Sequence, residues 1–166
     1  MSAYTTRFGS LKDFQKGEIE IINDDPKNFA FSNVFEVASR SLPYEKVVVA
    51  RNLQYVIEAI RAEGTSAWYT ADHDEFAVVM DGSVEVELVK LDHPAAVVPP
   101  GTEGAILVAG EPAGKRMGRI ILGRGHQALL PKGAAYRFSA AQPACMIQQG
   151  ILGALSVEKW ADICYR

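Results

Sequence analysis

Apolar and polar residues alternate with a period of two along most of the chain from about residue 47 onward. In SVEVEL, residues 83–88, valine and leucine alternate with two glutamates, which predicts a strand with one buried face. Similar segments recur, and together they predict an all-β sandwich or barrel. They are KVVVA (46–50), QYVIEAIRAEG (54–64), FAVVM (76–80), GRIIL (118–122), HQALL (126–130), AYRFSA (135–140) and ACMIQQGIL (144–152).

Glycine-containing turns separate several of these segments. Asp81-Gly82 directly follows FAVVM and predicts a tight two-residue hairpin, because glycine tolerates the positive φ that such a turn requires. Gly123-Arg124-Gly125 and Pro131-Lys132-Gly133 punctuate the second half of the chain.

Three segments depart from the strand pattern around a barrel expected at 47–155. Residues 1–46 have irregularly spaced apolar residues and are predicted to form an N-terminal arm that contacts another subunit. Residues 92–118 are rich in proline, glycine and alanine and predict a long loop or a loose hairpin extension. At 156–166, Ser156 can cap a short C-terminal helix. The apolar residues of the arm include Ile19, Ile21, Phe29, Phe31, Val34 and Phe35.

Composition narrows the class of protein further. The 166 residues suffice for one domain, and 48% hydrophobic with 22% charged residues is ordinary for a globular chain. A formal charge of −3 gives no basic footprint, which argues against nucleic-acid binding. The N-terminus has no apolar signal region, and no apolar run reaches membrane-spanning length. Two cysteines without paired spacing fit a reducing compartment, so we expect a cytoplasmic protein that does not enter the membrane.

Two spacings in this sequence resemble the paired motifs of the cupin superfamily of small β-barrels. Glu75, six residues and Gly82 match the end of the first motif. Gly125, five residues and Pro131-Lys132-Gly133 match the second motif without a gap. The resemblance implies a jelly-roll barrel, also called a double-stranded β-helix, whose interior carries metal ligands.

The ligand positions themselves have changed. Counted back from Glu75, the two histidine positions of the first motif fall on Tyr69 and Ala71, or on Trp68 and Thr70 with a longer spacing. In the second motif, Tyr136 stands at the histidine position and Ala140 at the asparagine position. Only Glu75 remains of the four ligands. A non-haem iron site generally needs two imidazoles and a carboxylate, so we expect this chain to bind no metal.

Histidines elsewhere in the chain leave an alternative open. His73 precedes Glu75 by two residues, so both would face the same side of a strand, and His126 follows Gly125. A non-standard metal site of His73, Glu75 and His126 would make the chain a stand-alone dioxygenase. The simpler interpretation places His73 in a solvated loop and His126 on an ordinary strand.

Trp68 and Tyr69 also allow two interpretations. An aromatic pair at the mouth of a small barrel usually fills the core. Alternatively, the two residues contribute to a pocket for a flat aromatic ligand, in this barrel or at a contact with another subunit.

Beyond the barrel motifs, the whole chain resembles the small subunit of the two-subunit hydroquinone 1,2-dioxygenases. The similarity covers the N-terminal arm, SAWYTADHDEFAVVMDG, GRGHQALLPKGAAYRFSA and the closing LSVEKWADICYR. The resemblance implies a larger cupin partner that holds Fe(II) and, with O2, converts hydroquinone to 4-hydroxymuconic semialdehyde. It also implies two small plus two large chains. The small chain would then serve assembly and shape the partner's site, with Trp68 reaching the substrate.

Two other functions remain open from the residues alone. A metal-free cupin isomerase or epimerase could use Tyr69, Tyr136 and His126, but no aspartate has an evident place to orient His126. A sensor of a small aromatic compound would need an output segment, and none is visible in the sequence.

Overall fold

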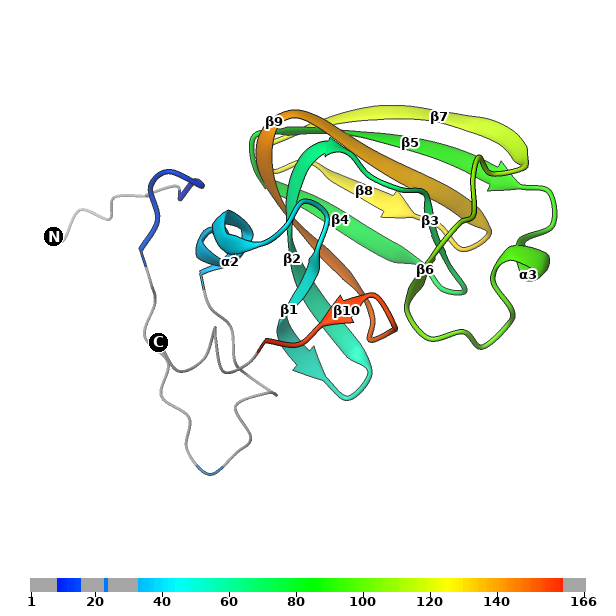
Figure 1. The fold of residues 1–166 in the computed structure, drawn as a ribbon, viewed down its shortest axis with the longest axis horizontal. Coiled ribbons are helices and arrows are strands. Elements are labelled where there is room, and N and C mark those ends of the chain that lie inside the picture. Colours follow the sequence, from blue (N-terminus) through cyan, green and yellow to red (C-terminus); the bar gives the residue numbers. More distant parts are fainter. Residues whose placement is uncertain (1–8, 16–22, 24–32, 160–166) are drawn as a thin grey trace, which may run out of the picture.

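The structure is a computed structural model that describes residues 9–15, 23 and 33–159. Strands dominate these residues, and they form one curled sheet (Figure 1). Two short helices accompany them, α2 (Val34–Arg40) and α3 (Pro94–Val97). The all-β prediction is therefore confirmed. The strands are β1 (Lys46–Asn52), β2 (Tyr55–Thr65), β3 (Tyr69–Ala71), β4 (Glu75–Asp81), β5 (Ser83–Leu91), β6 (Ala105–Leu107), β7 (Gly114–Gly123), β8 (Gln127–Leu130), β9 (Ala134–Ile151) and β10 (Ser156–Val157).

Strand β9 belongs to both halves of the barrel. Its first half pairs with β5 and β3, and its second half pairs with β2 and β4, always antiparallel. The outer strands β7, β6, β1 and β8 pair with β5, β3, β2 and β4. Residues 141–143 are exposed and lie between the two paired stretches. This interruption explains why the sequence indicates two strands where the structure has one bent strand.

The inward-facing side chains of both halves form the main hydrophobic core. The predicted alternation holds in β5, where Val84, Val86 and Leu88 are buried and join this core. The core also includes Ile60, Val79, Leu122, Leu130, Phe138 and Met146. Burial of these side chains holds the two halves of the curled sheet together, because each removes a large apolar surface from water.

The Asp81-Gly82 turn is only partly as predicted. Gly82 has φ +81°, as a tight turn requires, but β4 and β5 do not pair with each other. Both pair with β9, so the turn passes the chain from one half of the barrel to the other. A Cβ at Gly82 would lie 2.7 Å from the Cβ of Ala144 on β9, so close packing adds to the need for glycine.

The segment 92–118 has more structure than the predicted loop. It contains α3, then β6, which pairs with β3, and it includes the first half of β7. Strand β7 therefore starts four residues before the predicted GRIIL segment, at Gly114. The alternation of apolar and polar residues could not predict β6, because a strand of three residues is too short to show a period of two.

Helix α2 lies within the predicted N-terminal arm and packs on this chain's own barrel. Val37 contacts Val47, Val49 and Ala59, while Phe35 lies in a cluster with Cys145. Asn33 caps the helix by accepting a hydrogen bond from the backbone of Phe35. Phe35 is thus buried without a second subunit. Of the other apolar arm residues named from the sequence, Val34 packs against both clusters, and Ile19, Ile21, Phe29 and Phe31 lie outside the described residues.

The predicted C-terminal helix does not begin at Ser156. Ser156 and Val157 form β10, which runs parallel to β1, and residues 160–166 lie outside the described residues. The Ser156 hydroxyl donates to Glu58 instead of capping a helix. Neither described helix has the length and apolar character needed to cross a membrane.

Candidate functional site

Three of the four expected ligand positions meet inside the barrel. Tyr69 on β3 pairs in register with Tyr136 on β9, and the ring centroids are 5.7 Å apart. The Tyr136 hydroxyl donates to Glu75 Oε2 at 2.6 Å. Tyr69 belongs to the main core. Of the two motif spacings, the one that assigns the histidine positions to Tyr69 and Ala71 therefore places them on the inward-facing side of the strand. The two cupin spacings therefore identified positions that converge in space.

Further polar side chains extend this contact through the interior. Gln148 Nε2 donates to the Tyr136 hydroxyl at 3.0 Å, and Gln148 lies opposite Glu58 in the β2–β9 register. Glu58 accepts from Lys46 at 3.4 Å and from Ser156 at 2.7 Å. We call this set the interior polar network: Lys46, Glu58, Tyr69, His73, Glu75, Tyr136, Gln148 and Ser156. Lys46, Glu58 and Gln148 belong to no cupin motif, and sequence reasoning missed them.

Burial and neighbouring charges shift the pKa values of several groups in the network. Burial acts to raise the pKa of Glu75, but His73, Lys46 and the Tyr136 hydroxyl outweigh it and lower the pKa below its ordinary value. Burial, reinforced by the nearby Glu75 charge, raises the pKa of Tyr136 well above the ordinary tyrosine value. Burial also raises the pKa of Glu58, although Lys46 opposes this shift. Glu75 is therefore a carboxylate and Tyr136 a neutral phenol at neutral pH.

The network does not fit the ferrous ion that the cupin resemblance implies for a catalytic barrel. Such an ion needs two inward imidazoles and a carboxylate with open positions beside them. Here neutral phenols stand at the imidazole positions, and one of them occupies Glu75 Oε2. The Lys46 ammonium, 5.3 Å from the Tyr69 ring centroid, adds a positive charge to the same region. In the part of the chain that the structure describes, no three His, Cys, Asp or Glu side chains are grouped to hold a metal.

The proposed trio of His73, Glu75 and His126 does not come together. His73 Nε2 lies 3.6 Å from Glu75 Oε1, so that half of the trio is present. His126 is exposed in the turn between β7 and β8, where its Nδ1 accepts a hydrogen bond from the Gly123 backbone. His126 is therefore exposed, whereas Tyr69 and Tyr136 are buried in the core. These three residues do not form the site that the isomerase or epimerase alternative requires. His73 does lie in the loop between β3 and β4, but its ring nitrogens are buried, so the expectation that it is solvated is wrong. The expectation that His126 belongs to a strand is also wrong, because it lies in the turn.

The lowered pKa of Glu75 predicts a specific loss of stability in acid. A carboxyl with a folded-state pKa below its unfolded value of about 4.3 stabilises the fold above that pH. This contribution is lost as the pH falls through the folded-state pKa. We expect the Tm of Glu75→Gln to fall less steeply below about pH 5 than that of the unmodified chain. Glu63→Gln, at a more exposed position, is the control, and parallel curves for all three proteins would contradict the prediction.

Gly150 on β9 leaves room for Glu75. A Cβ at this position would lie 2.5 Å from Glu75 Oε1, so Gly150→Ala must displace a carboxylate held by Tyr136. We expect a loss of about 1–3 kcal/mol in the free energy of unfolding, the usual cost of leaving buried polar partners unsatisfied. Gly123→Ala is the matched control, because its Cβ would meet nothing closer than 3.5 Å. Chemical denaturation of both variants measures the difference, and equal stabilities would show that Glu75 moves freely.

Trp68 points away from the interior polar network. It packs in a separate cluster with Val89, Leu91 and Ala135, whereas its neighbour Tyr69 lies in the main core. Adjacent residues of an extended chain face opposite sides. Of the two pocket locations considered for Trp68, the interior of this barrel is therefore wrong. A contact with another subunit stays a prediction.

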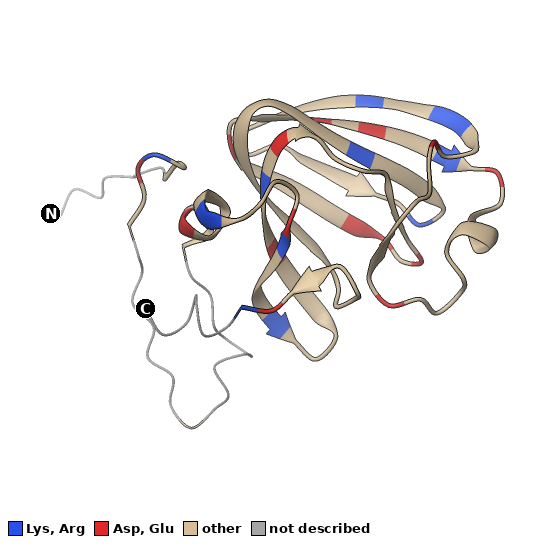
Figure 2. Cartoon of the chain, in the orientation of Figure 1, with Lys and Arg blue, Asp and Glu red and all other residues tan. Residues whose placement is uncertain are grey.

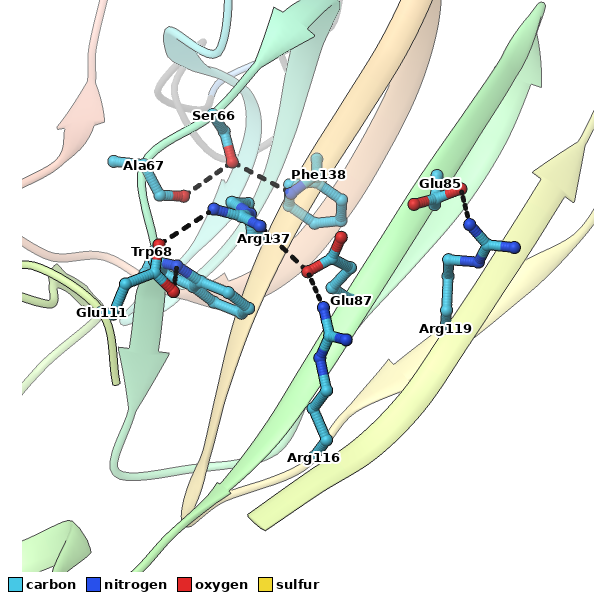
Figure 3. A network of polar contacts seen from close by, with 10 residues as sticks. All are labelled: Ser66, Ala67, Trp68, Glu85, Glu87, Glu111, Arg116, Arg119, Arg137 and Phe138. Atoms are coloured by element: carbon cyan, nitrogen blue, oxygen red, sulfur yellow. Dashed lines mark hydrogen bonds and ion pairs between the residues drawn. The ribbon is translucent and has the colours of Figure 1, made fainter. Parts of the chain in front are cut away.

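Charged side chains hold the indole in place (Figure 3). Trp68 Nε1 donates to Glu111 Oε2 at 3.1 Å, and the Arg137 guanidinium lies 4.4 Å from the ring centroid. Arg137 also donates to Glu111 at 3.3 Å and to Glu87 at 3.0 Å. Glu111 follows β6, in the segment that the sequence indicated as a loop. Its role could not be foreseen without knowing that this segment folds back over β3.

The ion pairs continue along β5 and β7. Arg116 contacts Glu87 and Arg119 contacts Glu85, so acidic and basic residues stand side by side on this face (Figure 2). A hollow of about 250 Å³ lies between them, lined by Glu87, Arg116, Gly118 and Arg119. Trp68 does not line this hollow: it is linked to Glu87 only through Arg137, and just 5% of its own surface is exposed.

A different part of the outer surface is apolar. Ile57, Gln149, Phe76 and Leu129 are consecutive register partners across β2, β9, β4 and β8. Ile57, Phe76 and Leu129 are all exposed, as is the nearby Tyr55. A groove of about 330 Å³ adjoins this row and is lined by Ala50, Arg51, Asn52, Tyr55, Val56, Ile57 and Gln149.

Comparisons with known proteins identify the relatives of this chain. A scan against protein-family models and a search of curated proteins both found no match. Among solved structures, hydroquinone 1,2-dioxygenase from Sphingomonas sp. TTNP3 with 4-hydroxybenzoate bound is 56% identical. The match covers 98% of both chains with a TM-score of 0.90. Hydroquinone 1,2-dioxygenase PnpCD in complex with Cd2+ and 4-hydroxybenzonitrile is also 56% identical. It covers 99% of this chain and 98% of the other with a TM-score of 0.88.

More distant matches support the fold alone. A cupin-2 domain protein from Shewanella frigidimarina NCIMB 400 is 18% identical, covering 70% of this chain and 89% of the other with a TM-score of 0.50. A chain in PnpCD in complex with Fe3+ is 11% identical with a TM-score of 0.58. This match covers 82% of the present chain but only 37% of that longer chain. The fold is thus that of a cupin, and with 56% identity over nearly its whole length the chain belongs to the hydroquinone 1,2-dioxygenase family.

Proposed function

We propose that this chain is the small subunit of a two-subunit, Fe(II)-dependent hydroquinone 1,2-dioxygenase. In this proposal a larger cupin subunit binds the iron and cleaves hydroquinone with O2 to 4-hydroxymuconic semialdehyde. The present chain supports assembly and shapes the partner's active site, in a complex of two small and two large chains. It supplies no metal ligand and no catalytic residue of its own.

The observation that carries the proposal is the combination of close kinship with an altered interior. The chain is 56% identical to chains from hydroquinone 1,2-dioxygenase structures over nearly its whole length. Yet the positions where a cupin holds its metal contain Tyr69 and Tyr136, the latter hydrogen-bonded to Glu75. A dioxygenase that uses a metal must then hold it elsewhere, and a second type of chain is the simplest place.

Two further observations support a larger partner of the same fold. PnpCD structures match this chain twice, once over almost the full length of a chain and once over 37% of a longer chain. In addition, the outer face of the present barrel exposes Ile57, Phe76 and Leu129 in one row. Contiguous exposed apolar side chains of this kind often mark protein interfaces.

Trp68 is the residue that we propose lies at the partner's substrate pocket. A rigid indole can contact a phenolic ring and help to exclude water from it. Its position in a cluster separate from the barrel's main core favours a contribution to another subunit over one to the interior of this barrel. We propose no such contact for Tyr69, which is buried among core residues and faces Tyr136.

Expression of the chain with and without a larger cupin subunit tests the proposal. The chain alone should purify with no bound iron and no ring-cleaving activity, and a tagged copy should retain the larger subunit. The reconstituted complex should contain iron and consume hydroquinone and O2 together. Iron bound by the isolated chain with ring-cleaving activity would overturn the proposal, as would a complex that never forms.

A further inference from the structure

The interior polar network contains buried atoms that no described group satisfies. Gln148 has no exposed surface, and its Oε1 accepts no hydrogen bond within the described part of the chain. Both ring nitrogens of His73 are also buried without a hydrogen bond there, although Nε2 lies 3.6 Å from Glu75. An unsatisfied buried acceptor costs about 1–3 kcal/mol. Such groups are therefore almost always met by another partner, including ordered water.

Lys46 brings donors to the same region. Its ammonium has three N–H donors, it is buried, and its contact with Glu58 is long at 3.4 Å. Gln148 lies directly opposite Glu58 in the β2–β9 register, and both side chains are buried inside the barrel. Lys46 Nζ thus contacts Glu58, the residue that faces Gln148 across one rung of the sheet, so the spare donors of Lys46 lie in the same part of the interior as the spare acceptor of Gln148.

The charges around these groups select the kind of ligand. The Lys46 ammonium disfavours a metal cation, and the carboxyl groups of Glu58 and Glu75 disfavour an anion. A small neutral molecule that both accepts and donates hydrogen bonds fits the remaining requirement, and a buried water typically makes about three such bonds.

We propose that the interior polar network is a binding site for a buried water molecule, which accepts from Lys46 Nζ and donates to Gln148 Oε1. The site lies beside the positions of Tyr69 and Tyr136, where a metal-binding cupin has imidazoles. A water molecule thus takes the structural place of the ion and connects Lys46–Glu58 to Gln148–Tyr136–Glu75. The inference concerns this barrel only and stands whether or not the larger-subunit proposal is correct.

A crystal structure of the full chain at a resolution that shows ordered solvent tests the site. Anomalous data collected at the iron and zinc absorption edges distinguish water from a metal. We expect a solvent peak within hydrogen-bonding distance of both Gln148 Oε1 and Lys46 Nζ, without anomalous signal. The unmodified protein is sufficient for this test: an anomalous peak at the site, or no peak at all, would overturn the proposal.

A pair of variants sharpens the test. Gln148→Met keeps the side-chain length but removes the acceptor, so the solvent peak should be lost while Tyr136 still contacts Glu75. Gln149→Met, one residue along β9 on the outer face, should retain the peak. Magnetic relaxation dispersion of water counts long-lived internal water molecules in solution and should report one fewer in Gln148→Met. Retention of the peak in Gln148→Met would overturn the proposal, because the water would then not depend on Gln148 Oε1.

Discussion

Trp68→Ala in the assembled dioxygenase should raise the KM for hydroquinone by roughly tenfold, since about 1.4 kcal/mol corresponds to a factor of ten. The expectation rests on the proposed contact of the indole with the substrate ring. Aromatic contacts contribute about 0.5–1.5 kcal/mol beyond the burial of their surface. Iron content should stay unchanged, because under the proposed function Trp68 contacts the substrate ring and is not a metal ligand. Steady-state kinetics and metal analysis of the purified complex measure both quantities.

The structure also requires a control for packing. Trp68 is buried with Val89, Leu91 and Ala135, so its truncation should lower the Tm whatever its role in binding. Leu91→Ala removes a buried side chain from the same cluster without touching the indole's polar partners. It should therefore lower the Tm but leave KM unchanged. If Trp68→Ala behaves like Leu91→Ala in both measurements, Trp68 is a packing residue and the proposed substrate contact is wrong.

The contacts of Arg137 and Glu111 with Trp68 limit how the indole could contact a substrate. The Arg137 guanidinium lies 4.4 Å from the ring centroid and Glu111 accepts from Nε1, so the described structure leaves little of the indole open. A substrate ring can therefore meet only the small exposed part of Trp68 while Arg137 stays in place. Arg137 and Glu111 would fix the orientation of that part, which makes them positioning residues under the proposed function.

The sequence was sufficient to predict the barrel and the convergence of its altered ligand positions. Period-two alternation identified β5, and two motif spacings placed Tyr69, Glu75 and Tyr136 together although Tyr136 follows Glu75 by 61 positions in the sequence. A spacing motif succeeds here because it records which strand positions face inward at the same end of a barrel. The same periodicity could have separated Trp68 from Tyr69, since neighbours on a strand face opposite sides.

Other residues of the site could not be predicted because nothing local marks them. Lys46 and Gln148 lie in segments that read as ordinary strands, and only the pairing of β1, β2 and β9 brings them together. Glu111 reaches Trp68 because β6 pairs with β3 after a long excursion of the chain. Such partnerships depend on long-range strand order. A single sequence without an alignment does not contain that information in any one segment.

Tyr136→Ala should be among the most damaging substitutions in this chain. Tyr136 is almost fully buried, packs against Tyr69 and Phe138, and is the only described donor to Glu75 Oε2. Truncation of a buried aromatic ring typically costs about 3–5 kcal/mol. It also leaves the Glu75 carboxylate and the Gln148 amide without their partner. For a chain of this size about 1 kcal/mol shifts the Tm by roughly 2–4 °C, so we expect a fall of about 10 °C.

Tyr136→Phe tests the contribution of the hydroxyl to stability separately from that of the ring. It keeps the packing but removes the donor to Glu75 and the acceptor for Gln148, which should cost about 1–3 kcal/mol. Tyr55→Phe, at an exposed position on β2, is the matched control and should leave the Tm unchanged. A Tyr136→Phe variant as stable as the unmodified chain would mean that the phenol only fills space. A clear loss would instead show that the Tyr136 hydroxyl, at a cupin histidine position, stabilises the fold by satisfying Glu75, the one residue of the cupin ligand set that this sequence retains.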